Sequence, residues 1–447
     1  MPKQFKAGPS FLLINPPIYD FAAHDLWLRP LGLLYIAAML ESSGAAVELI
    51  DCLDRNHPLV PAQDSNLYGC GKYHTEVIAK PAAYKNIPRN YKRYGLSGPA
   101  LKAALERVSR PDMVLVSSGM SYWYPGVQEA VASVKEIFPG APVVLGGIYA
   151  TLCPEHAERH SGADFVIPGT GLSPLSQLIK DLLKFQIDFP ESFSDYPGPE
   201  NRFYSKAGYA VTRTARGCPF DCSYCAQKAL NSPGIQAKDP PRVIDELTVL
   251  ALAGIENIAF YDDALLFKPE EHIMPILTEI VNRKLNIRFH TPNGLHSRFI
   301  SPRLALLLKD SSFEMPRISL ETADPLSQQR TGAKVTSSEF AHAAQCLKGA
   351  GYKPGEFIAY LMLGMPGQAP EEVENTVRFA HACGARVSLS EYSPIPGTRD
   401  WQEAAGFLLS DDPLWHNNSV FPALKPEERF EANRVKQLAV KMNKCFT

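Results

Sequence analysis

Short apolar runs alternate with stretches of helical periodicity along most of the chain. In the first part, runs of strand length lie at 11–15, 47–51, 113–118, 143–147 and 165–167, and helical stretches lie at 31–40, 126–137 and 175–183. Strands that are buried on both faces read as continuous apolar runs, and their alternation with helices is typical of a parallel sheet. The pattern predicts a doubly wound, Rossmann-like α/β domain that binds ligands at the carboxyl ends of its strands.

The same alternation resumes further along the chain, in six strand–helix units. Strands are expected at 209–212, 258–263, 287–291, 317–321, 356–364 and 386–391, with helices at 243–253, 270–283, 302–308, 337–349 and 371–383. Repeated units of this kind predict a second α/β domain with a parallel sheet.

Changes of composition divide the chain into four parts. We expect the first domain over 1–187, a linker rich in Pro, Ser and acidic residues over 188–202, and the second domain over 203–400. A C-terminal extension follows over 401–447. Its amphipathic helix, expected at 427–442, would cap the bottom of the second domain or line the substrate side.

A long insertion at 52–95 interrupts the first domain. Loops of this length are usually functional or disordered, and its aromatic and Gly content argues against disorder. A lid over a ligand and a merely structural flap both remain open. Tyr122, Trp123 and Tyr124 follow a strand and would either face a ligand or pack their own loop.

The overall composition is that of a globular protein. The chain has 447 residues, of which 45% are hydrophobic and 21% charged, with a formal net charge of −2. This length exceeds one ordinary core, so two or three domains are expected. There is no bulk basic field for nucleic acid, and no run approaches the roughly 20 apolar residues of a membrane span. Nine cysteines without regular pairing, and no signal peptide, predict a cytoplasmic location.

Three of these cysteines lie in one short loop, where Cys218, Cys222 and Cys225 have the spacing C-x3-C-x2-C. Iron–sulfur clusters are held by cysteine thiolates, and a cubane held by three of them keeps one iron open for a small molecule. Gly217 and Pro219 suit a loop wrapped around such a cluster. The alternative is a zinc knuckle or three unrelated thiols, although no fourth Cys or His follows closely enough to complete a zinc site.

This loop, with Tyr224 before its last cysteine, resembles the signature of the radical S-adenosylmethionine (SAM) enzymes. The resemblance implies a 4Fe-4S cluster on Cys218, Cys222 and Cys225, whose open iron binds the amino and carboxylate groups of SAM. One electron from the cluster then cleaves SAM and yields a 5′-deoxyadenosyl radical. The resemblance also implies that the six strand–helix units form a partial (β/α)6 barrel of the TIM type, with active groups at the carboxyl ends of the strands.

Polar residues follow the strands of this barrel. The contacts implied by the resemblance are Asp262 and Asp263 for the methionine amino group, Ser319 and Glu321 for the ribose and carboxylate, and Gly364 and Tyr392 for the adenosine pocket. Each residue alone is explained as well by helix capping or turn chemistry. Their occurrence at successive strand ends favours a site.

The first domain resembles the cobalamin-binding domain that precedes many radical SAM cores, through residues 15–17, 30–32, 146–147 and 169–171. The resemblance implies that cobalamin lies across the carboxyl edge of the sheet, where glycines let the backbone come close. The implied contacts are Ser118, Gly119, Gly146, Gly147, Gly169 and Gly171. The Asp-x-His-x-x-Gly signature of a histidine lower ligand is absent, and His24 does not match it. We therefore expect a lower face that is open, water-bound or met by another side chain.

Four further residues have open roles. His290 and His296 are candidate proton carriers or cobalamin-side contacts, with structural histidines as the alternative. Cys346 and Cys383 lie in or at the end of predicted helices and are interpreted as packing residues.

The two resemblances, with the sheet domain placed before the cysteine loop, imply a cobalamin-dependent radical SAM methyltransferase that acts on an unactivated carbon of a small molecule or peptide. One alternative is a radical SAM cyclase, rearrangement or oxidoreductase enzyme in which cobalamin does not methylate or is absent. The other is a non-catalytic regulatory protein that binds cobalamin or an Fe–S cluster. We expect an electron donor such as flavodoxin or ferredoxin as partner, and neither nucleic acid nor membrane.

Overall fold

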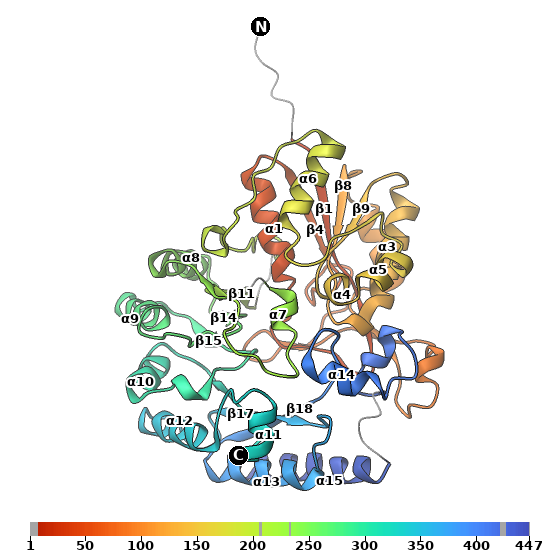
Figure 1. The fold of residues 1–447 in the computed structure, drawn as a ribbon. Coiled ribbons are helices and arrows are strands. Elements are labelled where there is room, and N and C mark those ends of the chain that lie inside the picture. The colour runs from red at the N-terminus through yellow and green to blue at the C-terminus, as the bar shows by residue number, and fades with distance from the viewer. Residues whose placement is uncertain (1–7, 205–207, 232–233, 421–425, 447) are drawn as a thin grey trace. The chain divides into compact units, whose positions relative to one another are not determined.

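The chain folds into two compact units in a computed structural model, which describes residues 8–204, 208–231, 234–420 and 426–446 (Figure 1). The first unit comprises the chain up to Gly208, together with Ala229–Asn231 and Ser410–Val420. The second comprises Tyr209–Lys228, Ser232–Leu409 and the chain after Val420. Each unit is built around parallel strands.

A five-stranded parallel sheet forms the centre of the first unit. Its order is β10 (Phe165–Val166), β9 (Val143–Leu145), β8 (Met113–Val116), β1 (Ser10–Asn15) and β4 (Ala46–Asp51). The predicted doubly wound domain is confirmed. The strand order reverses between β1 and β8, and the carboxyl ends of the strands at such a switch point are where α/β sheets bind ligands.

Helices cover both faces of this sheet because successive strand side chains point to opposite sides. Phe11 and Leu13 pack in one core with α1 (Leu31–Ser42) and α6 (Leu172–Leu183). Leu12 and Ile14 pack in another core. That second core takes in α2 (Gly98–Leu105) and α3 (Tyr124–Ile137), while the short helices α4 (Ile148–Leu152) and α5 (Pro154–His160) follow β9. Helices α2, α4 and α5 were not predicted from the sequence.

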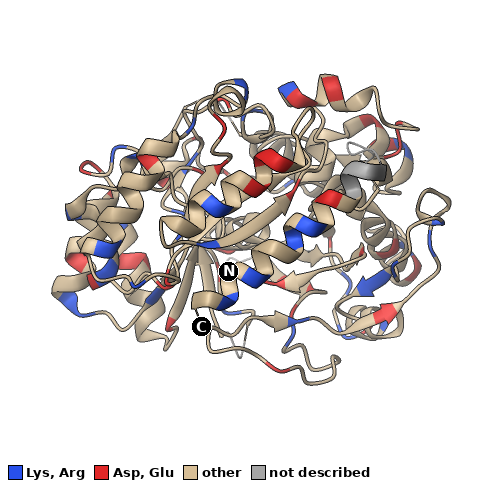
Figure 2. Cartoon of the chain, turned by 90° about the horizontal axis from the view of Figure 1, so that it is seen from below, with Lys and Arg blue, Asp and Glu red and all other residues tan. Residues whose placement is uncertain are grey.

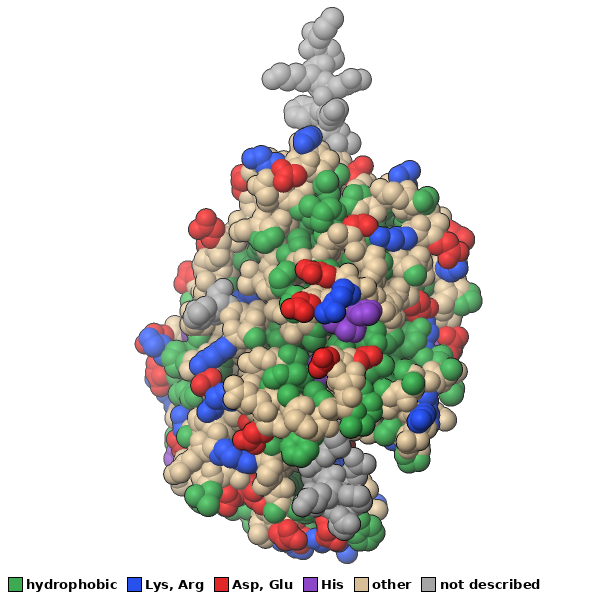
Figure 3. Space-filling view, turned by 45° about the vertical axis from the view of Figure 1, so that its right-hand side comes forward, with side chains coloured by type: hydrophobic (Ala, Val, Ile, Leu, Met, Phe, Trp, Pro, Cys, Tyr) green, Lys and Arg blue, Asp and Glu red, His purple; other side chains and the backbone are tan. Residues whose placement is uncertain are grey.

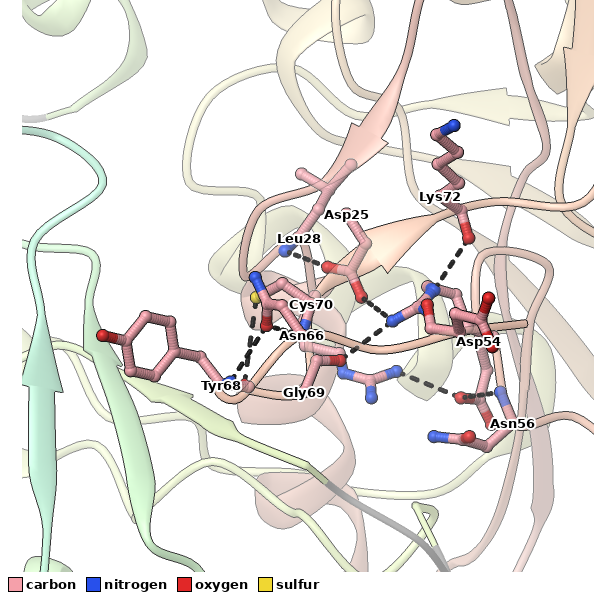
Figure 4. A network of polar contacts seen from close by, with 12 residues as sticks. Asp25, Leu28, Asp54, Asn56, Asn66, Tyr68, Gly69, Cys70 and Lys72 are labelled. Atoms are coloured by element: carbon pink, nitrogen blue, oxygen red, sulfur yellow. Dashed lines mark hydrogen bonds and ion pairs between the residues drawn. The ribbon is translucent and has the colours of Figure 1, made fainter. Parts of the chain in front are cut away.

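The insertion at 52–95 is folded. It contributes the strands β5 (Gly71–Lys72), β6 (Thr75–Val77) and β7 (Lys92–Tyr94) and the short helix η1 (Ala82–Tyr84). The strands form two small antiparallel sheets, β2 (Ile18–Asp20) with β7 and β6, and β3 (His24–Asp25) with β5. The buried guanidinium of Arg55 donates to the backbone oxygens of Asp64, Gly69 and Lys72 and lies 3.7 Å from Asp25 (Figure 4). These contacts favour the structural-flap alternative, and the lid remains a prediction.

The predicted linker packs against the first unit. It contains η3 (Phe193–Asp195), and the rings of Phe193 and Tyr196 lie 5.8 and 5.7 Å from the ring of Tyr35 in α1. Further on, the hydroxyl of Tyr204 donates to Asp51 at the end of β4. The first unit therefore includes the predicted linker and continues to Gly208.

Residues Ser410–Val420, here called the return segment, bring the chain back to the first unit. Leu414, in η5 (Pro413–His416), lies in the core with α3, and its carbonyl accepts a hydrogen bond from Tyr84. His416 Nδ1 lies 2.8 Å from Ser121 Oγ in η2 (Ser121–Trp123), and Asn417 donates to the buried Asp20. The apolar side chains of the return segment therefore complete the core of the first unit, a role that the sequence did not predict.

The six predicted strands of the second unit are present, but they form two parallel sheets of three strands each. One contains β11 (Ala210–Thr212), β14 (Asn257–Phe260) and β15 (Arg288–His290), and the other contains β16 (Arg317–Glu321), β17 (Ile358–Leu363) and β18 (Arg386–Glu391). An isolated parallel bridge between Leu295 and Ile318 joins them. Pro292 follows β15 and cannot donate to a ladder, which helps to explain why pairing breaks there.

Helices alternate with these strands as predicted. They are α8 (Pro240–Leu252), α9 (Ile273–Arg283), α10 (Pro302–Asp310), α12 (Ser337–Gly349) and α13 (Pro370–Ala382). The C-terminal helix α15 (Pro426–Asn443) ends against the outer strand β18, where the side chain of Asn443 bonds both the N–H and the carbonyl of Val387. This contact protects the sheet edge.

Charged side chains of both signs are interspersed along the helices in Figure 2, in keeping with the small net charge. The face shown in Figure 3 likewise mixes apolar and charged side chains. Among the described residues, no helix is both long and apolar enough to cross a membrane.

The return segment should make the first unit sensitive to acid. Burial, and then the charge of His156, lower the pKa of His416 from 6.5 to about 4, so its contribution to stability is complete above pH 6.5 and is lost as pH falls towards 4. Between pH 7 and 5, the melting temperature of the wild type should fall by about 5 °C more than that of His416→Asn. Calorimetry of both proteins measures this difference, and equal pH dependence would contradict the prediction.

Candidate active site

The three cysteines lie in a loop that begins at β12 (Ala215–Arg216), and we call residues 217–225 the cluster loop. Gly217 has φ +98°, and a Cβ there would lie 2.1 Å from the carbonyl oxygen of Gly234, so only glycine fits. Cys218 and Cys222 are partly buried and Cys225 is exposed. Within the described ranges, no three His, Cys, Asp or Glu side chains are arranged to hold one metal ion. In a cubane each cysteine ligates a different iron, so the three thiols need not converge on one point.

The buried carboxylate of Asp262 fixes the start of the cluster loop. It follows β14 and accepts hydrogen bonds from the backbone N–H groups of Thr214 and Ala215 and from the Thr214 hydroxyl, at 2.6–3.1 Å. His272 Nε2 lies 2.8 Å from the same hydroxyl. Burial raises the pKa of Asp262 to about 6, against these hydrogen bonds. The predicted ammonium contact does not suit this carboxylate, whose oxygens are occupied within the protein, and we assign it a positioning role.

Asp263 also holds the loop but lies closer to the thiols. Its Oδ2 accepts the N–H of Gly217 at 3.0 Å, and its Oδ1 lies 3.5 Å from Arg213. Its negative charge raises the pKa of Cys218 and Cys225. The predicted ammonium contact therefore remains a prediction for Asp263.

A lysine that the sequence analysis did not single out lies beside the cluster loop. Lys334 Nζ is 3.0 Å from Glu321 Oε1, and both side chains are largely buried. Burial lowers the pKa of Lys334, but Glu321 and Cys222 outweigh it, so that the pKa is raised and the ammonium is retained. Its positive charge lowers the pKa of all three loop cysteines.

Backbone contacts bring Lys334 to this position. The segment between α11 (Pro325–Arg330) and Lys334 packs on the cluster loop, where the N–H of Ser223 donates to the carbonyl of Thr331. Gly332, with φ +104°, has no room for a Cβ beside the carbonyl oxygen of Asp221. Local sequence gives little signal for such a contact because more than a hundred residues separate its two sides.

Glu321 reaches Lys334 through a strained strand end. The pairing of β16 with β17 shifts register between Ser319 and Glu321, and Glu321 has φ +65°. A left-handed conformation is uncommon for a residue other than glycine, and such strain concentrates at functional sites. At this strand end the Glu321 carboxylate pairs with the ammonium of Lys334.

Burial makes the three thiols of the cluster loop harder to deprotonate. Burial raises the pKa of all three loop cysteines, that of Cys222 to about 11. The backbone N–H of Phe220 opposes this rise at Cys218, and that of Gln227 opposes it at Cys225. Because iron binds the thiolate form, loading the site releases protons.

The residues predicted to line the adenosine pocket lie next to a small group of apolar side chains that includes a residue of the cluster loop. Tyr392, which follows β18, packs with Met365 and with Tyr224 of the loop. Gly364 has φ +85°, and its N–H donates to the Gln368 side chain at 2.9 Å. The structure thus brings the predicted residues Gly364 and Tyr392 close to the cysteines.

Buried polar atoms at the same end of the strands lack protein partners. Among described residues, Ser319 Oγ and both ring nitrogens of His296 have none. Buried polar atoms without protein partners are where a polar ligand can bind, so the residues of this site fit such a ligand. By contrast, His290 bonds Asn257 at 3.2 Å, and Cys346 and Cys383 pack in or against the core, which supports the structural readings of these three residues.

Some of the predicted cobalamin contacts pack against other parts of the protein, and others are open. Ser118 directs its hydroxyl to the carbonyl of Gly146, and the Cβ positions of Gly119 and Gly147 would clash with Trp123 and Ser118. Contacts within the protein therefore account for a serine at 118 and for glycines at 119 and 147 without a ligand.

Other positions at the same edge do fit a large planar ligand. A Cβ at Gly169 would meet nothing within 4 Å, and one at Gly146 would have only the Ile167 oxygen, at 3.7 Å. Gly171, with φ +74°, begins α6. Met120, after β8, exposes 45% of its surface.

The role of Asp262 can be tested by Asp262→Asn. The amide would turn its own N–H toward buried donors, which should lower stability by about 3 kcal/mol and reduce the iron bound after reconstitution. Iron analysis and thermal unfolding measure both effects. Normal iron content with a raised KM for SAM would instead support the ammonium contact, and Asp310→Asn in α10 is a control.

The charge of Lys334 can be tested by Lys334→Gln, with Lys334→Arg as the matched control. Loss of a positive charge beside the thiolates should make the cluster's reduction potential more negative by tens of millivolts, whereas arginine should keep it. Redox titration followed by electron paramagnetic resonance measures the potential. Equal potentials in all three proteins would contradict this role.

Comparison with known proteins identifies both units. The chain matches the Radical SAM superfamily model over residues 212–380 and the B12 binding domain model over residues 97–179. It is 24% identical to an uncharacterized methyltransferase, PH0819, of Pyrococcus horikoshii, over 73% of this chain and 77% of the relative. It is 22% identical to the cytidylyl-2-hydroxyethylphosphonate methyltransferase of Streptomyces wedmorensis, over 97% of this chain and 89% of the relative.

A solved structure has the same fold. The radical S-adenosylmethionine methyltransferase TsrM from Kitasatospora setae, with cobalamin and a [4Fe-4S] cluster bound, superposes with a TM-score of 0.67 and 15% identity. The match covers 98% of this chain and 89% of TsrM. With both domain models matched in this order, the chain belongs to the radical SAM enzymes that carry a cobalamin-binding domain.

Proposed function

We propose that the protein is a cobalamin-dependent radical SAM methyltransferase that methylates an unactivated carbon of a small molecule or peptide. The observation that carries this proposal is the three-cysteine loop with its buried Lys334–Glu321 pair, in a chain that also has a B12 binding domain. The methyltransferases among its relatives support the methyl-transfer part.

With cluster, SAM and cobalamin bound, the cofactors supply a 5′-deoxyadenosyl radical and a methyl group. Cys218, Cys222 and Cys225 would hold the cluster. The ammonium of Lys334 suits the carboxylate of SAM, since opposite charges form strong hydrogen bonds in a buried place. Asp263 and Glu321 offer carboxylates for its ammonium group.

The residues around these charges orient the ligand and keep water away. The apolar cluster of Tyr224, Met365 and Tyr392 offers ring and thioether surface to an adenine. In the first unit, the open positions at Gly146 and Gly169 and the exposed side chain of Met120 would contact cobalamin.

The proposal extends to the electron donor and to the cellular location of the protein. A radical enzyme of this kind needs single electrons, and we propose a small donor such as flavodoxin or ferredoxin. We also propose a cytoplasmic location, which is supported by nine cysteines with no regular pairing.

The proposal can be tested by following two products of SAM. Anaerobically purified protein with cobalamin, a reductant and candidate substrates should form both 5′-deoxyadenosine and S-adenosylhomocysteine. Cys222→Ala should reduce both to background, whereas Cys445→Ala, at an exposed cysteine outside the site, should not. Chromatography with mass detection measures both products.

Each other outcome has a defined meaning. 5′-Deoxyadenosine without S-adenosylhomocysteine would contradict methyl transfer and favour a cyclase, rearrangement or oxidoreductase. Unchanged colour and activity in Cys222→Ala would contradict a radical SAM role.

A further inference from the structure

Helix α14 (Arg399–Ala405) contacts the cluster loop beside Cys222. The backbone N–H of Asp400 donates to the carbonyl of Ser223 at 3.0 Å. Asp400 is the second residue of α14, where a backbone N–H has no acceptor within the helix. Ser223 is 2% exposed and follows Cys222 directly, so this hydrogen bond holds the backbone next to one of the three cysteines.

Further contacts of α14 reach the other side of Cys222. The guanidinium of Arg399 donates to the carbonyl of Asp221, the residue before Cys222, at 2.6 Å. Near the other end of the helix, the buried Ala404 packs in the apolar cluster that contains Tyr224 of the cluster loop. Iron bound to Cys222 restricts the backbone that carries these carbonyl groups, so cluster binding also restricts α14.

The chain that leaves α14 enters the first unit after a short connection. The helix ends at Ala405, and the return segment begins at Ser410. Within the connection, the N–H of Phe407 donates to the carbonyl of Ala404, and the N–H of Leu408 donates to that of Ala405. Each residue of even a fully extended chain spans at most about 3.6 Å. The position of α14 therefore limits the positions that the return segment can take.

The return segment packs beside a residue that is proposed to contact cobalamin. His416 Nδ1 lies 2.8 Å from the hydroxyl of Ser121, which directly follows the exposed Met120. The carbonyl of Leu414 accepts a hydrogen bond from the buried Tyr84. Loss of these contacts would loosen the edge of the sheet that is proposed to hold cobalamin.

We propose that α14 and the return segment form a strap that couples binding of the iron–sulfur cluster to binding of cobalamin. This inference rests on the proposed function and adds to it a dependence of each cofactor on the other. When the cluster binds, the cluster loop and α14 become ordered, and the return segment then loses less conformational freedom on packing into the first unit. Coupling between two binding sites is reciprocal, so bound cobalamin also favours the cluster.

The first experiment follows amide hydrogen exchange in protein with and without the cluster, in the absence of SAM and cobalamin. Loading the cluster should slow exchange of residues 410–420 about tenfold in the wild type. Asp400→Pro removes the N–H that bonds Ser223 and should abolish this slowing. Proline suits the first turn of a helix, as Pro241 shows at the same position of α8. Equal exchange of residues 410–420 with and without the cluster in the wild type would overturn the proposal.

Glu371→Pro is the matched control for this variant. It places proline at the exposed second residue of α13, after Pro370, and should keep the response of the wild type. Iron analysis allows the proteins to be compared at equal cluster content. Loss of the response in Glu371→Pro as well would show that proline itself is responsible, and would overturn the role of the Asp400 hydrogen bond.

A second variant lengthens the connection and leaves the contacts at both of its ends in place. Two glycines inserted after Gly406 should leave iron content unchanged, because the contacts of α14 with the cluster loop remain. Exchange of residues 410–420 should then no longer respond to the cluster. A response equal to that of the wild type would overturn the strap.

The second experiment measures the coupling between the two cofactors. Hydroxocobalamin is titrated into protein with and without the cluster, and equilibrium dialysis with absorbance detection gives its affinity. The wild type should bind hydroxocobalamin about tenfold more tightly with the cluster, and the glycine insertion should reduce this ratio to about one. Equal affinity of the wild type in both states would overturn the coupling.

The two experiments separate this inference from the proposed function, since neither needs a methyl acceptor or turnover. A protein that binds no cobalamin in either state would contradict the proposed function and the cobalamin half of this proposal, while the exchange of residues 410–420 still decides whether the strap responds to the cluster. Methyl transfer by the wild type together with a wild-type exchange response in Asp400→Pro would overturn only the role of α14.

Discussion

The hydrogen bonds to the buried carboxylate of Asp262 are the constraint on which the candidate site depends. They fix Thr214 and Ala215, which lead through Arg216 into the cluster loop. A loop that carries three cysteines and a glycine in a left-handed conformation has little regular structure of its own. Its geometry is imposed from outside, by Asp262 and Asp263 on one side and by the segment that ends at Lys334 on the other.

The same arrangement concentrates charge. Three thiols that become thiolates on binding iron, with Asp263 and Glu321, form a strongly negative region in a partly buried place. Lys334 offsets part of this negative charge through its ion pair with Glu321. The left-handed backbone conformation of Glu321 is a strain of the kind that concentrates at functional sites. Where a ligand brings its own carboxylate and ammonium, such a region can exchange internal ion pairs for pairs with the ligand. Binding and loop order are then coupled.

The features that could be predicted from the sequence are those that depend on residues close to one another in the chain. Cys218, Cys222 and Cys225 were found from their spacing, and most strands from continuous apolar runs. The parts it missed depend on tertiary contacts. Lys334 comes near the thiols through the contacts of Thr331 and Gly332 with the cluster loop. The return segment has the sequence of an ordinary tail, and only the structure shows that Leu414 lies in the core of the first unit. Asp262 was assigned to the ligand because a carboxylate at a strand end gives the same signal whether it binds substrate or backbone.

His296 illustrates a signal of the opposite kind. From the sequence it was one of two histidines near a strand end, with nothing to separate it from His290. Burial alone does not separate them either, because both are nearly inaccessible. The difference lies in their partners: His290 has Asn257, whereas the ring nitrogens of His296 face a place that the described chain leaves unmatched. Buried polar atoms without partners are destabilising and therefore rare. A side chain that retains two of them beside the cluster loop is better explained by a bound ligand than by packing within the protein.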